Sequence, residues 1–281
     1  MTILQAIILG IVQGLTEFLP ISSSGHLILV PWLFDWEYLL ENPEFNKTFD
    51  VALHLGTFIA LVIYFWRDIG ALLAAWARTL RTRRADEPEG RLAWLILLTM
   101  VPAAIAGLLL EETIVNTLGA PWLIAVLLIV FGAVMWAVDR WSRKVREVDD
   151  LGWRGALAIG VSQALALSPG VSRSGVTMVA GLLVGLKREA AARFSFLMSI
   201  PIIGGAALYS GIGLVQEGLP EGTAAAFVAG MTAAALSGFA AIWFLLAYLR
   251  RHSFMPFVLY RFAVGFGALL LMALGVRAAV I

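Results

Sequence analysis

The feature that most constrains this chain is a series of apolar segments, each long enough to cross a lipid bilayer. A helix needs about 20 predominantly apolar residues to span the hydrocarbon core. Such segments recur along the chain, for example at residues 92–110, 121–138 and 224–249. Only 14% of the 281 residues are charged, and these segments lack the polar outer face of a soluble helix. The sequence therefore predicts an all-α polytopic membrane protein forming one membrane domain over residues 1–281.

The distribution of charge predicts which linkers face the cytoplasm. Basic residues concentrate in linkers at residues 67–91, 140–154, 187–193 and 250–251, which the positive-inside rule places in the cytoplasm. The other linkers carry the acidic residues Glu37, Glu41, Glu44, Glu111, Glu112, Glu217 and Glu221. Six full spans place every linker on the side that its charge predicts. They cover residues 49–66, 92–110, 121–138, 194–215, 224–249 and 256–276.

Two further apolar regions, residues 3–36 and 155–186, begin and end on one side of the membrane by this charge pattern. Each is interrupted by a polar stretch, so we expect a re-entrant helix–loop–helix that enters the membrane and returns. Non-helical backbone at that depth is tolerated only where protein or a wet cavity surrounds it. The alternative, two crossings per region, needs spans of about twelve residues, which are too short for an ordinary bilayer.

An internal repeat appears when the chain is shifted by 150 residues. Pairs that then coincide without a gap are Ala6 and Ala156, Gly10 and Gly160, Gln13 and Gln163, Leu15 and Leu165, Ser22 and Ser172, Ser24 and Ser174, and Gly25 and Gly175. Residues 1–150 enter from outside and residues 151–281 from inside, which predicts an inverted repeat. Proteins of this architecture place their site near the midplane, where the broken helices meet.

The first polar stretch, QGLTEFLPISSSGH at residues 13–26, is here called the first motif. Gln13 and Glu17 are four residues apart and share one helix face. Glu17, helped by the neutral Gln13, is the candidate ligand for a divalent cation, Mg²⁺ or Ca²⁺, because such ions use one or two carboxylates plus substrate oxygens. His26 is the candidate general base for Ser23 or for a water.

The second polar stretch, SPGVSRSGVT at residues 168–177, is here called the second motif. Arg173 offers a cation suited to bidentate phosphate contact, and a helix that follows a Ser/Gly loop presents free N–H groups to anions. Glu17, Ser23, His26 and Arg173 are therefore the candidate catalytic residues. The candidate substrate-binding residues are Gln13, Ser22, Ser24, Gly25, Gly170, Ser172, Ser174, Thr177 and Arg261.

Several of these residues have an equally good structural interpretation. Ser22, Ser24, Ser172 and Ser174 could cap helices or allow close helix packing. Arg261 could extend to a lipid headgroup instead of a substrate phosphate. His54, four residues after Asp50, could anchor a helix end or support the site. Glu17, His26 and Arg173 point more strongly to function, because ionisable groups within a membrane are costly.

The two motifs resemble those of the undecaprenyl-diphosphate phosphatase family, which is linked to bacitracin resistance. The first motif is similar in its Gln13-x-x-x-Glu17 spacing and the following FLPISSSGH run, and the second matches throughout. The resemblance implies a bacterial inner-membrane enzyme with a divalent metal and a site open to the periplasm. It implies an essential Glu17, catalytic Ser23 and His26, and diphosphate binding by Arg173. Many relatives have Glu where this chain has Gln13, so the first motif of this chain has one carboxylate where theirs has two.

Other functions remain to be weighed against this one. A secondary transporter shares the architecture, and phosphate release without a membrane gradient would separate the two. A second membrane phosphatase superfamily is excluded, because its Ser-Arg signature continues to a His that is absent after Arg173. The nucleophile is left open between Ser23 and water. We expect a polyprenyl diphosphate and membrane lipid as partners and no nucleic acid, and the sequence leaves open whether the protein is a homodimer.

Overall fold

The structure, a computed structural model, describes residues 1–217 and 222–280, without the side chains of residues 110–117 and 207–217. Apart from one isolated bridge between Arg146 and Leu186, the regular structure in this part of the chain is helical. The helices are α1 (Ile3–Phe18), α2 (Ser23–Phe34), α3 (Glu37–Glu41), α4 (Pro43–Thr82), α5 (Pro88–Thr117), α6 (Pro121–Trp141), η1 (Val148–Asp150), α7 (Trp153–Ser162), η2 (Gln163–Leu167), α8 (Arg173–Leu183), α9 (Arg188–Glu217), α10 (Ala224–Leu249) and α11 (Met255–Ala273).

Five helices among the described residues are long and apolar enough to cross a membrane, which confirms a multi-pass membrane protein. They are α4, α6, α10, α11 and the segment Pro88–Leu109 of α5. The sixth expected span, residues 194–215, lies on α9, and its side chains from residue 207 onward are outside the described part. The same holds for the side chains of Glu111, Glu112 and Glu217 and for the whole of Glu221.

The two regions expected to be re-entrant each form short helices joined by a loop. Helix α1 has 16 residues and α2 has 12, while α7 and α8 have 10 and 11, all below the length of a full span. Helix α1 begins at a capping box in which the side chains of Thr2 and Gln5 satisfy each other's backbone N–H groups. It ends just before Pro20, which cannot continue a helix.

Helices α2 and α8 begin with the same unusual backbone geometry. Their N-cap residues are Ser22, with φ 79° and ψ 97°, and Ser172, with φ 78° and ψ 114°. In both, the serine Oγ accepts a hydrogen bond from the glycine three residues later, at 3.4 Å and 3.1 Å. Positive φ is uncommon for a residue other than glycine and costs free energy, so the surrounding structure must hold both serines in place.

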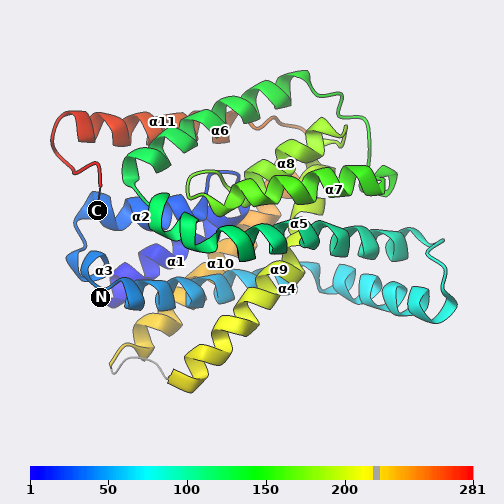
Figure 1. The fold of residues 1–281 in the computed structure, drawn as a ribbon, viewed down its shortest axis with the longest axis horizontal. Helices are drawn as coiled ribbons and strands as arrows, with labels where there is room; N and C mark the ends of the chain where they lie inside the picture. The colour runs from blue at the N-terminus through cyan, green and yellow to red at the C-terminus, as the bar shows by residue number, and fades with distance from the viewer. Residues whose placement is uncertain (218–221, 281) are drawn as a thin grey trace.

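The long helices pack around these short ones (Figure 1). Helix α1 packs against α10, α7 packs against α5, and α6 lies beside α11. Glycines allow the closest approaches: a Cβ on Gly10 would lie 2.3 Å from the Gly230 carbonyl oxygen, and one on Gly160 would lie 2.9 Å from the Thr99 oxygen. This packing brings the α1–α2 loop and the loop before α8 together in the interior.

Candidate active site

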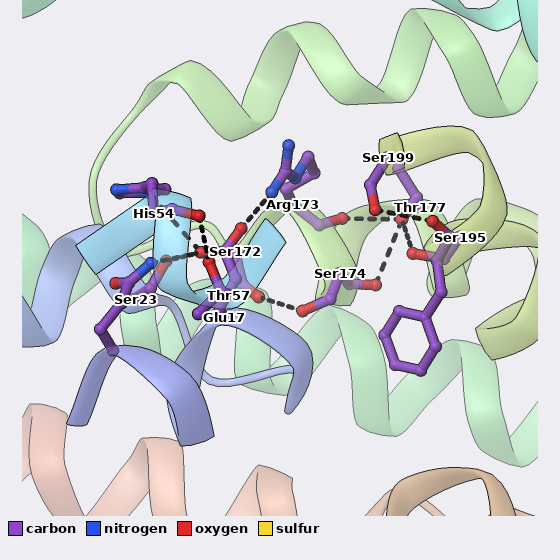
Figure 2. Close-up of polar contacts among 12 residues, drawn as sticks. Glu17, Ser23, His54, Thr57, Ser172, Arg173, Ser174, Thr177, Ser195 and Ser199 are labelled. Carbon is purple, nitrogen blue, oxygen red and sulfur yellow. Dashed lines mark hydrogen bonds and ion pairs between the residues drawn. The ribbon is translucent and has the colours of Figure 1, made fainter. Parts of the chain in front are cut away.

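Glu17, in the last turn of α1, is the centre of the polar cluster shown in Figure 2. Its residue surface is only 7% exposed. One carboxylate oxygen, Oε1, forms an ion pair with Nη2 of Arg173. The other, Oε2, accepts hydrogen bonds from the Ser23 hydroxyl at 2.5 Å and from the Gln13 amide at 3.3 Å. The first and second motifs therefore meet at one carboxylate, as the sequence predicted.

Two serine hydroxyls join the loops behind this cluster. The Ser22 Oγ accepts a hydrogen bond from the Gly170 N–H at 3.0 Å, and the Ser174 Oγ donates to the Leu19 carbonyl at 3.1 Å. Gly170 has φ 97°, and a Cβ there would lie 2.8 Å from the Ile124 carbonyl oxygen, so glycine is required on both grounds. These contacts give Ser22, Ser174 and Gly170 a structural role that fixes one loop against the other.

Arg261, on α11, is a correction to the sequence-based assignment. We expected it either to contact a substrate phosphate or to extend to a headgroup, but it is fully buried at 0% exposure. Its guanidinium donates to backbone carbonyl oxygens of Pro20 in the first motif and of Gly170 and Val171 in the second. It also donates to Leu127 and Leu128 of α6. All of these hydrogen bonds go to backbone carbonyl oxygens, so Arg261 holds both loops together.

A cavity of about 640 Å³ opens on one side of Glu17. Five predicted site residues line it: Glu17, Ser23, Ser24, Ser172 and Arg173. The rest of the wall is mainly apolar and comes from α4, α5, η2 and α9, with lining residues that include Val51, Met100, Ala103, Ala104, Ala166, Leu167, Pro201, Ile202, Ile203, Gly205 and Ala206. The cavity therefore pairs one charged, hydroxyl-bearing end with a long apolar wall.

His26 does not lie at the charged end of this cavity. Its Nδ1 donates to the Ser22 carbonyl at 2.7 Å, which leaves Nε2 to accept from the Tyr260 hydroxyl at 2.9 Å. The ring is buried and stacks on Tyr260. Both ring nitrogens thus have partners away from Ser23. The structure does not bring His26 to the hydroxyl for which it was the candidate base.

Thr177 and Gly25 also lie outside the cavity lining. The Thr177 hydroxyl contacts the Arg173 carbonyl at 2.7 Å and the Ser195 hydroxyl at 2.6 Å, which ties α8 to α9 (Figure 2). Gly25 lies in the first turn of α2, where a Cβ would be 3.2 Å from the Gly170 nitrogen. Both residues position the two loops against their neighbours.

Two residues outside the predicted site also line the cavity: His54, for which the sequence left open a helix-end anchor or a supporting role, and Gln163. His54 of α4 places Nε2 3.8 Å from Glu17 Oε2, and its Nδ1 donates to the Asp50 carbonyl at 2.8 Å. Gln163 donates to the Thr99 carbonyl at 3.2 Å. The repeat offered a signal for Gln163, because it is the equivalent of Gln13. For His54 the signals were an ionisable side chain near the end of a span and its spacing of four residues from Asp50.

The residues present fit a divalent cation that is shared with a bound ligand. Among the described residues, no group of three His, Cys, Asp or Glu side chains could hold a metal. However, the Gln13 Oε1 is buried without a hydrogen-bond partner, on the same amide group that contacts Glu17, although Gln13 itself lies behind the cavity lining. One carboxylate and one amide oxygen suit Mg²⁺ or Ca²⁺ when ligand oxygens supply further coordination. A cation site preformed by protein side chains alone does not fit.

Comparison with known proteins identifies the family of this chain. The profile of the bacitracin resistance protein BacA family matches residues 6–267. The undecaprenyl-diphosphatase of Moorella thermoacetica is 52% identical over 261 residues, which cover 93% of this chain and 94% of the relative. Those of Thermomicrobium roseum and Desulforudis audaxviator are 46% and 48% identical, covering 97% and 93% of this chain and 99% and 94% of the relatives. The matched region includes both motifs and nearly all of the helices, and the chain belongs to the bacitracin resistance protein BacA family.

Proposed function

We propose that this protein hydrolyses undecaprenyl diphosphate to undecaprenyl phosphate and inorganic phosphate. Relatives that share about half of its residues over nearly the whole chain are named undecaprenyl-diphosphatase. The observation that carries the proposal is the contact of Glu17 with both Arg173 and Ser23 at the charged end of the cavity. This activity would recycle a lipid carrier for cell-wall synthesis and give resistance to bacitracin, as the family name indicates.

The diphosphate would bind between the two motifs, with its negative charge facing Arg173. Phosphoryl transfer depends mainly on positioning and charge stabilisation, which an arginine and loop N–H groups can supply. The polyprenyl chain would lie along the apolar wall of the same cavity. A charged, hydroxyl-bearing end joined to an apolar wall suits an amphipathic lipid diphosphate better than a soluble nucleotide.

Ser23 is the proposed nucleophile, and an activated water is the alternative. In the first route the Ser23 Oγ attacks the terminal phosphorus while its proton passes to Glu17, which already accepts that hydrogen at 2.5 Å. The bond from this phosphorus to the bridging oxygen breaks, and undecaprenyl phosphate leaves. Water then hydrolyses the phosphoserine. In the second route water attacks directly, with Glu17 or His54 accepting its proton.

A divalent cation, Mg²⁺ or Ca²⁺, is proposed as the cofactor. Glu17 and the free amide oxygen of Gln13 would hold it together with oxygens of the substrate. When bound, it would neutralise charge that develops on the diphosphate.

Six spans and an inverted repeat are the proposed membrane topology. The supporting observations are the matching N-caps at Ser22 and Ser172 and the exchanged packing of α1 with α10 and α7 with α5. The basic linkers would face the cytoplasm and the cavity would open to the periplasmic side of a bacterial inner membrane.

Phosphate release by the purified protein in detergent tests the function directly. The wild-type protein should release phosphate from undecaprenyl diphosphate without any membrane gradient, which a transporter would not do. Glu17→Gln and Arg173→Ala should each lower kcat by about a hundredfold or more, because each removes a group from the site of charge development. Arg81→Ala, at an exposed arginine outside the cavity lining, is the matched control. Wild-type rates in both site variants would refute the assignment.

Trapping a phosphoserine separates the two routes. If Ser23 is the nucleophile, rapid acid quenching during turnover should yield a phosphorylated peptide that contains Ser23, and Ser23→Ala should yield none. Failure to trap it from a slowly turning-over variant would favour direct attack by water.

A further inference from the structure

The cavity is too small to enclose the whole proposed substrate. Its volume of about 640 Å³ falls in the range of pockets that enclose drug-sized molecules. An undecaprenyl chain is far larger than such a molecule. A substrate whose diphosphate lies between Ser23 and Arg173 must therefore pass most of its chain out of the cavity.

A second hollow continues from the apolar wall. This groove, of about 190 Å³, lies between α4, α5 and α9, and its lining includes Ile69, Leu73, Trp76, Leu97, Ile200 and Pro201. All of its lining side chains are apolar or aromatic. Figure 1 shows α4 and α5 running side by side, with α9 crossing them. We call it the α4–α5–α9 groove.

The α4–α5–α9 groove lies directly beside the cavity. Pro201 of α9 lines both hollows, and the next two residues, Ile202 and Ile203, belong to the cavity wall. On α5 the groove ends at Leu97 and the cavity begins at Met100, within one helical turn. The two hollows are therefore contiguous on α5 and α9, and in the proposed topology the groove lies towards the cytoplasmic ends of α4 and α5.

We propose that the α4–α5–α9 groove holds the isoprenoid chain of the substrate where it leaves the cavity, so that the protein favours long polyprenyl chains over short ones. The proposal rests on the proposed phosphatase function. Lipid tails are as apolar as leucine, so the groove gains no hydrophobic free energy over the bilayer. Its contribution comes from close packing against the chain, which orients the diphosphate towards Arg173.

Leu73 and Ile200 offer the test, because a tryptophan at either would fill the groove. Leu73 is 59% exposed, so a larger side chain there does not disturb the core. It lies nineteen residues beyond His54 along α4, roughly 28 Å at 1.5 Å per residue, so it cannot touch a diphosphate beside Glu17. Leu236→Trp on α10 is the matched control, since Leu236 is 70% exposed and lines neither the groove nor the cavity.

The experiment measures kcat/KM for undecaprenyl diphosphate and for farnesyl diphosphate, whose short chain ends within the cavity. For Leu73→Trp and Ile200→Trp, the ratio of the long-chain to the short-chain value should fall about threefold to tenfold, a modest effect because bilayer lipid competes for the same apolar surface. For Leu236→Trp the ratio should stay at the wild-type value.

If the ratio of long-chain to short-chain kcat/KM were unchanged in both groove variants, or fell equally in the Leu236→Trp control, the groove would not be the site of the isoprenoid chain. The proposed phosphatase function would not be affected by that result. Absence of phosphate release from either substrate by the wild-type protein would instead refute the proposed function, and the chain site with it.

Discussion

At the scale of single residues, Gln13 is the reason that the first motif has one carboxylate and not two. It lies one helical turn before Glu17, is fully buried, and has an amide oxygen without a hydrogen-bond partner. A neutral amide is a weaker ligand for a hard cation than a carboxylate is. The strength of cation binding should therefore depend on this side chain, while the catalytic groups around Glu17 stay in place.

Gln13→Glu should lower the Mg²⁺ concentration needed for half-maximal phosphate release by about fivefold to tenfold, because it adds a second carboxylate ligand. Removing divalent cations with a chelator should abolish phosphate release in both forms. Gln5→Glu is the matched control, since a glutamate can keep the capping box with Thr2 at the start of α1. An unchanged Mg²⁺ dependence would argue against Gln13 as a ligand.

Arg261→Lys should destabilise the protein, because lysine keeps the charge but cannot reach the carbonyl oxygens of both loops and of α6 at once. Leaving several buried carbonyls unpaired should cost about 3 kcal/mol or more. Thermal unfolding in detergent measures this. Arg277→Lys, at a more exposed ion pair with Asp35, should cost about 1 kcal/mol or less. Lost phosphate release at an unchanged Tm would instead point to direct phosphate contact.

At the scale of elements, the site depends on how α11 lies against α6. Arg261 can reach both loops only because α11 is held close enough for its guanidinium to touch Leu127 and Leu128 of α6. Gly265, one turn further along α11, permits that approach: a Cβ there would lie 2.8 Å from the Ala125 oxygen and 2.7 Å from Ile129 Cγ1. Gly267, two residues later, has no such neighbour within 4 Å.

Gly265→Ala should therefore lower the Tm by about 2 °C or more, since overpacking costs about 1–3 kcal/mol. Gly267→Ala gains the same helix propensity without the clash, so its Tm should stay level or rise slightly. Unfolding curves of the two variants, recorded in the same detergent, give the comparison. Equal Tm values would show that α11 can shift away from α6 at little cost.

At the scale of the whole molecule, the proposed topology places the acidic and basic linkers on opposite sides of the membrane. The chain contains no cysteine, so a single introduced cysteine reports its own position without background labelling. Glu41, after α2, and Asp86, between α4 and α5, are both exposed and fall on opposite sides in this topology.

Glu41→Cys should react with a membrane-impermeant maleimide in intact cells, whereas Asp86→Cys should react only after the inner membrane is opened. Labelling is read as a mass shift of the purified protein, with the cysteine-free wild type as the blank. The reverse pattern would invert the topology, and equal labelling of both would rule out an odd number of crossings between them.

The sequence was sufficient to predict a helical multi-pass membrane protein and the two charged residues that meet in its interior. Apolar segment length predicted the five candidate spans among the described residues, and the cost of burying charge singled out Glu17 and Arg173, which the structure brings into contact. It could not predict the partners of Arg261 or His26. Those depend on how α11 packs against α6 and α2, and the long-range contacts join residues between 90 and 241 positions apart. Local sequence patterns do not predict such packing.

The packing of α1 against α10 has a consequence for how the protein is made. Helix α1 leaves the ribosome long before its partner, which begins only at Ala224, and the cation that pairs with Glu17 lies 156 residues downstream. Until then a carboxylate has no counter-ion, and α1 is too short to be held as a full span. Contacts between distant segments form late and slowly. We therefore expect the nascent α1 to remain at the membrane surface or in the insertion machinery during synthesis. It should enter its final position only after most of the chain has been synthesised.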